Sequence, residues 1–296
     1  MIAGELGAAE PGRDGARWCA MIAVDLLGRY AAGRPLSPGY VGQLGWTLGA
    51  FGRVLGHVVK PADFTAENVN GYLVAEFERG LAPATRKNRR RMLLTLWAWL
   101  ADEGEAPAPP RRRIAPAPRF DPVPHAWTPD EVRRLLAAAA GLPGSLASIP
   151  ARAYWRAFVL VSWDSGLRGC DVRRLRVGDL CGCQVIRQVK AAGKPVLIRL
   201  RAETLASVRA TFPPDRELLF PLGRSIHSWR RRAARLVARA QLAGGIGRLR
   251  SSTGTAAEIA APGRGHEHLG NTREVFERHY LDRRLLSPDR PMPEEL

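Results

Sequence analysis

A proline-rich stretch at residues 105–125, EAPAPPRRRIAPAPRFDPVPH, constrains the fold of this chain more than any other feature. Proline removes a backbone donor and clashes with the preceding turn of a helix, so no packed helix or central strand is expected to run through it. We expect a semi-rigid linker between two domains. At 296 residues the chain is long enough to bury two modest cores. The predicted regions are an extension at 1–36, a helical domain at 37–104, the linker at 105–125, a second domain at 126–283 and a tail at 284–296.

The helical domain shows the 3.6-residue period of buried helix faces. Its apolar side chains recur in three blocks: Leu44, Leu48, Phe51 and Leu55; Val69, Tyr72, Leu73 and Phe77; and Met92, Leu93, Leu96, Trp97 and Leu100. Gly56 and Gly80 are expected to end the first two helices, and Thr65 is expected to cap the start of the second. A third helix is predicted from about Thr85.

Basic residues crowd the first two turns of that third helix: Arg86, Lys87, Arg89, Arg90 and Arg91. Cations near a helix N-terminus oppose the helix dipole, so the helix gains nothing from them in isolation. A partner that carries phosphates would compensate for this arrangement. The alternative is a solvated basic face. The linker run Arg111, Arg112 and Arg113 is open to the same two interpretations.

The second domain begins with a clear helix start, in which Thr128 precedes Pro129 and Glu131 completes a capping box. Residues 184–200 change to the alternating period of strands, with a glycine turn at Ala192-Gly193, and predict a β-hairpin. Helical patterns occupy the rest of the domain, at 154–162, 167–175, 202–211, 225–242 and the final stretch. The predicted fold is therefore mainly α with a small β-hairpin, an α+β class.

Charge indicates the kind of partner. Lys and Arg number 45 against 28 Asp and Glu, a formal net charge of +17, and most of the excess is arginine, whose planar fork suits phosphate. A polyanionic partner is expected, and nucleic acid is the first candidate. The alternative is compositional, because a GC-rich genome enriches proteins in arginine whatever they do.

Other classes of protein fit the sequence poorly. The pair Cys181 and Cys183 lacks a second pair or a nearby histidine, so no metal site and no cofactor are expected. The longest nearly apolar run, Met92–Ala101, is too short to span a bilayer, and the N-terminus shows no secretory signal pattern. The sequence predicts a cytoplasmic protein without a membrane partner.

Cutting a DNA strand without a metal needs a nucleophile, cations that neutralise the phosphorane, and an acid for the departing 5′ oxygen. The second domain offers such residues in an ordered series. Gly166-Leu167-Arg168 is followed by Asp171, Leu175 and Asp179, and the hairpin carries Lys190 and Lys194. Further on come Gly247-Arg248-Leu249-Arg250, then Leu269-Gly270-Asn271, then Tyr280.

This series resembles the tyrosine recombinases, the phage-integrase type of DNA strand-exchange enzyme. The resemblance covers residues 126–283 as the catalytic domain and, more loosely, 38–104 as a helical core-binding (SAM-like) DNA-binding domain. It implies that Arg168 and Arg250 clamp the scissile phosphate, that Tyr280 attacks phosphorus to form a 3′-phosphotyrosyl ester, and that Lys190 protonates the 5′ oxygen. It also implies a homo-oligomer on paired DNA sites, as in mobile elements.

Both histidines of the family pattern are replaced in this chain. Gly247 has no side chain to move a proton, and Asn271 donates a hydrogen bond but is no charged acid near neutral pH. His268 is the candidate substitute.

Two hypotheses follow: a recombinase or integrase, slowed by these replacements, and a DNA-binding protein that keeps the fold without the chemistry. A third hypothesis is a topoisomerase-like relaxase of supercoils, which shares the chemistry but not the site specificity.

Overall fold

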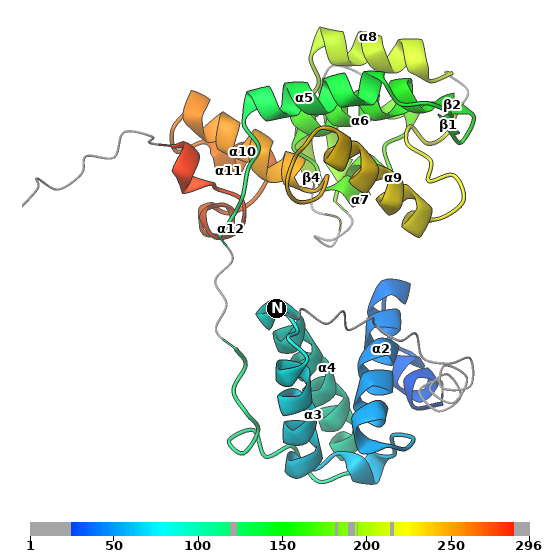
Figure 1. Cartoon of the computed structure of the whole chain (residues 1–296), viewed down its shortest axis with the longest axis vertical. Coiled ribbons are helices and arrows are strands. Elements are labelled where there is room, and N and C mark those ends of the chain that lie inside the picture. Colours follow the sequence, from blue (N-terminus) through cyan, green and yellow to red (C-terminus); the bar gives the residue numbers. More distant parts are fainter. Residues whose placement is uncertain are drawn as a thin grey trace, which may run out of the picture. The chain divides into compact units, whose positions relative to one another are not determined.

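The computed structural model divides into two compact units, residues 1–120 and 121–296 (Figure 1). The residues that it describes are 25–118, 123–180, 183–188, 193, 195–213 and 216–286.

The first unit is built from helices. After a helical segment at 25–31 come α2 (Pro38–Leu55), the short 3-10 turn η1 (Pro61–Asp63), α3 (Ala66–Glu78) and α4 (Pro83–Asp102). The ends of α2 and α3 follow the sequence signals: Gly56 ends α2 with a left-handed φ of 74°, and the Thr65 hydroxyl accepts from Asn68 N at the start of α3. These short-range signals act through the backbone, so they were visible without tertiary information.

The core of the first unit is aromatic. The Phe51 ring packs edge-on against Tyr72 and Phe64, with ring centroids 5.6 and 5.8 Å apart. The predicted apolar stripe of α4 is buried in the same cluster.

Part of the proline-rich stretch also packs on this unit. Ile114 is buried, and the Asn70 amide bonds to the backbone on both sides of it, at Arg113 O and Ala115 N, each at 2.8 Å. Proline excludes a helix there but not a docked extended segment.

The second unit centres on α6, which is buried over most of its length. The helices of this unit are α5 (Pro129–Ala140), α6 (Ala151–Ser165), α7 (Gly169–Val172), α8 (Ala202–Thr211), α9 (Ile226–Arg239), α10 (Arg248–Ala260), α11 (Gly265–Leu269) and α12 (Arg273–His279). The capping box at the start of α5 is present, with Glu131 N donating to Thr128 Oγ1 and Thr128 N to Glu131 Oε2. Figure 1 shows α10, α11 and α12 gathered at one end of the unit.

Two small antiparallel strand pairs complete the second unit. β1 (Ser145–Leu146) pairs with β2 (Ile149–Pro150), and β3 (Cys183–Arg187) pairs with β4 (Pro195–Arg199). The β3–β4 register joins Arg187 to Pro195. The predicted fold class, mainly α with a small β-hairpin, is confirmed.

One helix is shorter than predicted. The pattern at 167–175 predicts a helix, whereas α7 is a single turn from Gly169 to Val172. Arg168 has extended backbone, and after α7 the backbone bonds elsewhere, with Leu219 N donating to Leu175 O at 2.8 Å. This long-range pairing overrides the local helical period. A second short 3-10 turn, η2 (Val177–Asp179), follows.

None of the described helices combines the length and apolar character that a membrane crossing needs.

Candidate active site

A tight turn after α6 places the first arginine of the series. Gly166 ends α6 with a φ of 59°, and a β-carbon added there would lie 2.6 Å from Leu269 Cδ2. Glycine therefore meets both the left-handed backbone and the close approach of Leu269. The chain then extends through Arg168, which begins α7.

Arg250 joins three segments that are far apart in the sequence. It lies in the first turn of α10 and is 4% exposed. Its Nη1 donates to Gly166 O at 2.6 Å, and its Nη2 donates to Leu269 O at 2.9 Å and to Asn271 Oδ1 at 3.2 Å. One guanidinium thus holds the Gly166 turn and the turn after α11 together.

Tyr280 lies beside this guanidinium. The Arg250 Cζ is 4.8 Å from the centroid of the Tyr280 ring, a cation–π distance. Tyr280 ends α12, which is anchored by the buried ring of Phe276, and its carbonyl accepts from Thr255 Oγ1 at 3.3 Å. Its ring is half-buried, so the nucleophile candidate stands at the edge of the site.

The β-hairpin completes the site. Arg168 Nη1 donates to Gln188 Oε1 at 2.7 Å, and Gln188 is 1% exposed directly after β3. On the partner strand, Val196 packs so closely on Gly270 that an added β-carbon would lie 2.6 Å from Val196 Cγ2. The hairpin therefore contacts both the first arginine and the turn that carries Asn271.

The electrostatics of the site follow from this burial. Burial lowers the pKa of Arg250, the nearby Tyr280 raises it, and Arg168 lowers it again. A guanidinium has so high an intrinsic pKa that it stays cationic at neutral pH. Two cations held together in a partly dry site favour an anion between them.

Three buried donor atoms of this site have no hydrogen-bond partner among the described residues: Arg250 Nε, Asn271 Nδ2 and Gln188 Nε2. The two amide oxygens accept from the arginines, so the amide nitrogens are donors directed elsewhere. A buried unpaired donor costs about 1–3 kcal/mol. Donors of this kind are the partners that an oxyanion accepts from.

His268 lies near Arg250 and is held by a hydrogen bond to Thr253. Thr253 Oγ1 donates to Trp163 O at 2.5 Å, so it accepts from His268 Nε2, 3.0 Å away. Burial lowers the pKa of His268, the charge of Arg250 lowers it further, and Asp164 opposes them. The histidine is therefore neutral at neutral pH, with Nε2 as the protonated nitrogen.

The structure brings Arg168, Arg250, Asn271 and Tyr280 to one place. Lys190 and Lys194 lie outside the described residues. Gly247 is the residue before α10, with a φ of −63°, and a β-carbon added there would meet open space as far as the described residues go. The catalytic roles of all these residues stay predictions.

The predicted DNA-binding residues of α4 differ in their surroundings. Arg89 forms an ion pair with the buried Glu76, and Arg90 Nε donates to Ala115 O at 2.6 Å. Arg86 lies over the Phe77 ring, 4.8 Å from its centroid. Exposed side chains belong to Lys87, Arg111, Arg112 and Arg113. A role in DNA binding stays a prediction for all seven residues.

Two features were missed from the sequence. Gln188 carries no motif, and only its place directly after β3, where it continues the alternation of Gln184 and Ile186, signals burial. The helix α9 exposes a row of basic residues, Arg230, Arg231, Arg232, Arg235 and Arg239, opposite its apolar side. The helical period of residues 225–242 could have predicted this basic face from the sequence.

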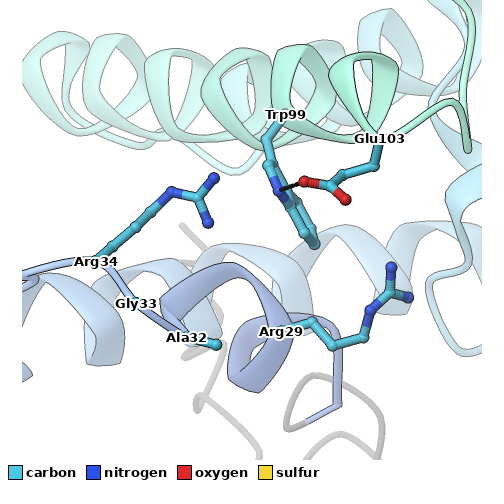
Figure 2. A pocket seen from close by; sticks show the side chains of 6 residues that line it. All are labelled: Arg29, Ala32, Gly33, Arg34, Trp99 and Glu103. Carbon is cyan, nitrogen blue, oxygen red and sulfur yellow. Dashed lines mark hydrogen bonds between the residues drawn. The ribbon is translucent and has the colours of Figure 1, made fainter.

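A pocket elsewhere in the described part of the chain has fewer unpaired buried polar groups than this site. A shallow pocket of about 500 Å³ in the first unit is lined by Arg29, Ala32, Gly33, Arg34, Trp99 and Glu103 (Figure 2). Its polar groups are paired internally, as in the bond of Trp99 Nε1 to Glu103 Oε1 at 3.0 Å. Within the described ranges, no group of three or more His, Cys, Asp or Glu side chains gathers to hold a metal ion.

Known proteins share this architecture. The chain is 28% identical over 229 residues to the tyrosine recombinase XerD of Caulobacter vibrioides, covering 70% of this chain and 72% of that protein. A crystal structure of a lambda integrase (75–356) dimer bound to a COC′ core site superposes with a TM-score of 0.69 and 18% identity, over 91% of this chain and 98% of that one. The XerH site-specific recombinase, in a post-cleavage complex with palindromic difH, superposes with a TM-score of 0.66 and 18% identity, over 93% of this chain and 87% of that one. No model of a known protein family matches the chain.

Fold, sequence similarity and the ordered series of residues agree on one class. The chain is similar in sequence to a tyrosine recombinase, and it shares the fold of the phage-integrase type of these enzymes.

Proposed function

We propose that this protein is a site-specific DNA recombinase or integrase that breaks and rejoins duplex DNA through a 3′-phosphotyrosyl intermediate. The observation that carries the proposal is the Arg250 guanidinium, which lies 4.8 Å from the Tyr280 ring and bonds to Asn271. Its own Nε and the amide nitrogens of Asn271 and Gln188 are unpaired buried donors. These groups suit a phosphate diester that is attacked by the tyrosine.

The reaction proceeds in two balanced steps. The Tyr280 hydroxyl loses its proton to solvent as its oxygen attacks phosphorus, the bond from phosphorus to the 5′ oxygen breaks, and Lys190 supplies a proton to that oxygen. Arg168 and Arg250 neutralise the charge that develops on the non-bridging oxygens, and the Asn271 amide donates to one of them. A 5′ hydroxyl then gives its proton to Lys190 and attacks the phosphotyrosyl ester, the bond from phosphorus to the Tyr280 oxygen breaks, and that oxygen takes up a proton from solvent. The ester conserves the energy of the broken bond, so no nucleotide cofactor is required.

Relatives support DNA as the partner and an oligomer as the working form. Lambda integrase is described as a dimer bound to a core site and as a tetramer bound to a Holliday junction. For this chain we propose a homo-oligomer on double-stranded DNA, with residues 37–104 as the core-binding domain and 126–283 as the catalytic domain. The basic face of α9 and the exposed Lys87 offer phosphate contacts.

A second candidate function is a DNA-binding protein without strand-transfer chemistry. The observation in its favour is that Gly247 and Asn271 stand at the histidine positions of the family, while the Nη atoms of Arg250 already bond to the protein.

A covalent-adduct assay separates the two. Wild type, Tyr280→Phe and the matched control Tyr40→Phe are incubated with nicked duplexes tiled from the DNA that flanks the gene. The recombinase proposal expects a denaturation-resistant band with wild type and Tyr40→Phe and none with Tyr280→Phe. Salt-sensitive binding to the same duplexes without any band would favour the second function.

A further inference from the structure

Gln188 is a buried polar side chain that no motif assigns. It is 1% exposed, it lies directly after β3, and its Oε1 accepts from Arg168 Nη1 at 2.7 Å. Ordering and burying a glutamine costs side-chain entropy and desolvation, so a buried glutamine needs partners for both of its polar atoms.

Only one of those atoms is satisfied by the described residues. Because the oxygen faces Arg168, the Nε2 amide must be directed away as a donor, and it has no partner in the described part of the chain. Asn271 repeats this arrangement with the second arginine: its Oδ1 accepts from Arg250, and its Nδ2 is unpaired. Each of the two arginines thus donates to the oxygen of one side-chain amide, and the nitrogen of each amide stays unpaired.

We propose that Gln188 is a ligand of the scissile phosphate. Its oxygen holds Arg168 in place, and its amide nitrogen donates to a non-bridging oxygen. This inference rests on the proposed strand transfer and adds a residue to its site. A neutral amide is suited to the task, since it accepts from a cation and donates to an anion at once, whereas a carboxylate would repel the phosphate.

Two substitutions, Gln188→Met and Gln188→Glu, distinguish the two roles of this side chain, which are to hold Arg168 and to bind the phosphate. Methionine keeps the volume and loses both bonds, whereas glutamate keeps the acceptor for Arg168 and loses the donor. Gln184→Met and Gln184→Glu are matched controls at a glutamine of β3, four residues earlier in the same alternation. Adduct formation on a nicked duplex is measured under single-turnover conditions, with melting temperatures to verify folding.

We expect Gln188→Glu to form adduct about 100-fold more slowly than wild type, the typical effect of one oxyanion donor. Gln188→Met should be slower still, because it also loses the bond that holds Arg168, and the Gln184 variants should match wild type. A Gln188→Glu protein with the wild-type rate would overturn the phosphate contact, because only the bond to Arg168 would then matter.

A modified substrate locates the contact. Methylphosphonate replaces one non-bridging oxygen of the scissile phosphate, in either of two diastereomers. The penalty of Gln188→Met should shrink to about threefold on the diastereomer that lacks the contacted oxygen, since a lost partner cannot be lost twice. An equal penalty on the natural phosphate and on both diastereomers would indicate a purely structural role and contradict the proposal.

A protein that does not transfer strands at all can be told apart from one in which only the Gln188 contact is absent. If wild type gives no adduct on any duplex, the proposed function is contradicted, and inorganic phosphate then decides the role of Gln188. At constant ionic strength, phosphate should raise the melting temperature of wild type and Gln184→Met but not that of Gln188→Met. Equal rises in all three proteins would overturn the site.

Discussion

The guanidinium carbon of Arg250 lies 4.8 Å from the centre of the Tyr280 ring, while the nitrogens of the same group bond to Gly166 O and Leu269 O. Arg250 is therefore both a structural residue and the cation beside the candidate nucleophile. This double role makes its substitution differ from that of Arg168, whose described contact is with the Gln188 side chain.

Replacement of Arg250 should affect stability as well as chemistry. Arg250→Ala leaves two buried carbonyl oxygens without their donors, and we expect the free energy of unfolding to fall by about 3 kcal/mol. Arg168→Ala should lower it by about 1 kcal/mol, the value of one hydrogen bond. Both variants should lose adduct formation. Urea unfolding followed by tryptophan fluorescence measures the difference, and equal unfolding midpoints would contradict the structural role.

Restoring the two histidines should accelerate cleavage. A β-carbon at Gly247 meets open space among the described residues, and Asn271 already bonds to Arg250, so we expect Gly247→His with Asn271→His to fold. We expect at least about tenfold faster adduct formation, a modest share of what acid–base catalysis contributes. Gly245→His, also at an open position, is the control. A double variant that folds but is no faster would show that proton transfer does not limit the rate.

His268 should make folding depend on pH. Because its pKa is lowered in the folded protein, the unfolded chain takes up a proton first as the pH falls below about 6.5. The free energy of unfolding should therefore be highest above that value and decrease as the pH falls toward the folded pKa. In His268→Gln this decrease should be absent, whereas the exposed His279→Gln should keep it. Urea titrations between pH 8 and 5.5 test this prediction, and identical slopes in all three proteins would refute it.

Asp282 anchors the chain just after Tyr280. Burial opposes its charge, but donors from Arg284 and from Ala126 N outweigh that effect and lower its pKa to about 2. Its stabilisation is complete above the unfolded pKa near 3.8 and is lost as the pH falls toward 2.

We expect Asp282→Asn to lower the free energy of unfolding by about 2 kcal/mol at pH 6, and this deficit to shrink between pH 4 and 2. The control is Asp130→Asn, at a highly exposed carboxylate, which should change little. A deficit that stays constant down to pH 2 would contradict the role of the charge.

Two cations on α4 should behave differently. Arg89 pairs with Glu76, which is 1% exposed and is otherwise approached by the more exposed Arg79 at 3.6 Å. Arg89→Ala should therefore cost about 3 kcal/mol of stability, because it uncovers a buried carboxylate. Lys87→Ala should leave stability within about 0.5 kcal/mol and weaken the salt-dependent affinity for DNA. Equal stabilities would show that the buried pair contributes nothing.

The sequence by itself determined the features that act over a few residues. Thr65 and Thr128 predicted helix starts, Gly56 predicted a helix end, and the alternation at 184–200 predicted the hairpin, because caps, left-handed glycines and strand periods depend on local backbone geometry. The ordered series of basic residues and Tyr280 was visible for the same reason, as a matter of spacing along the chain.

Only the tertiary structure decided which side chains meet and which atoms they leave unpaired. Arg250 and Gly166 are separated by 84 residues, and Arg168 and Gln188 by 20. The pairing of Arg89 with Glu76 rather than with solvent was equally invisible. Such contacts depend on how helices and the hairpin pack, and packing is set by the whole core rather than by any local pattern.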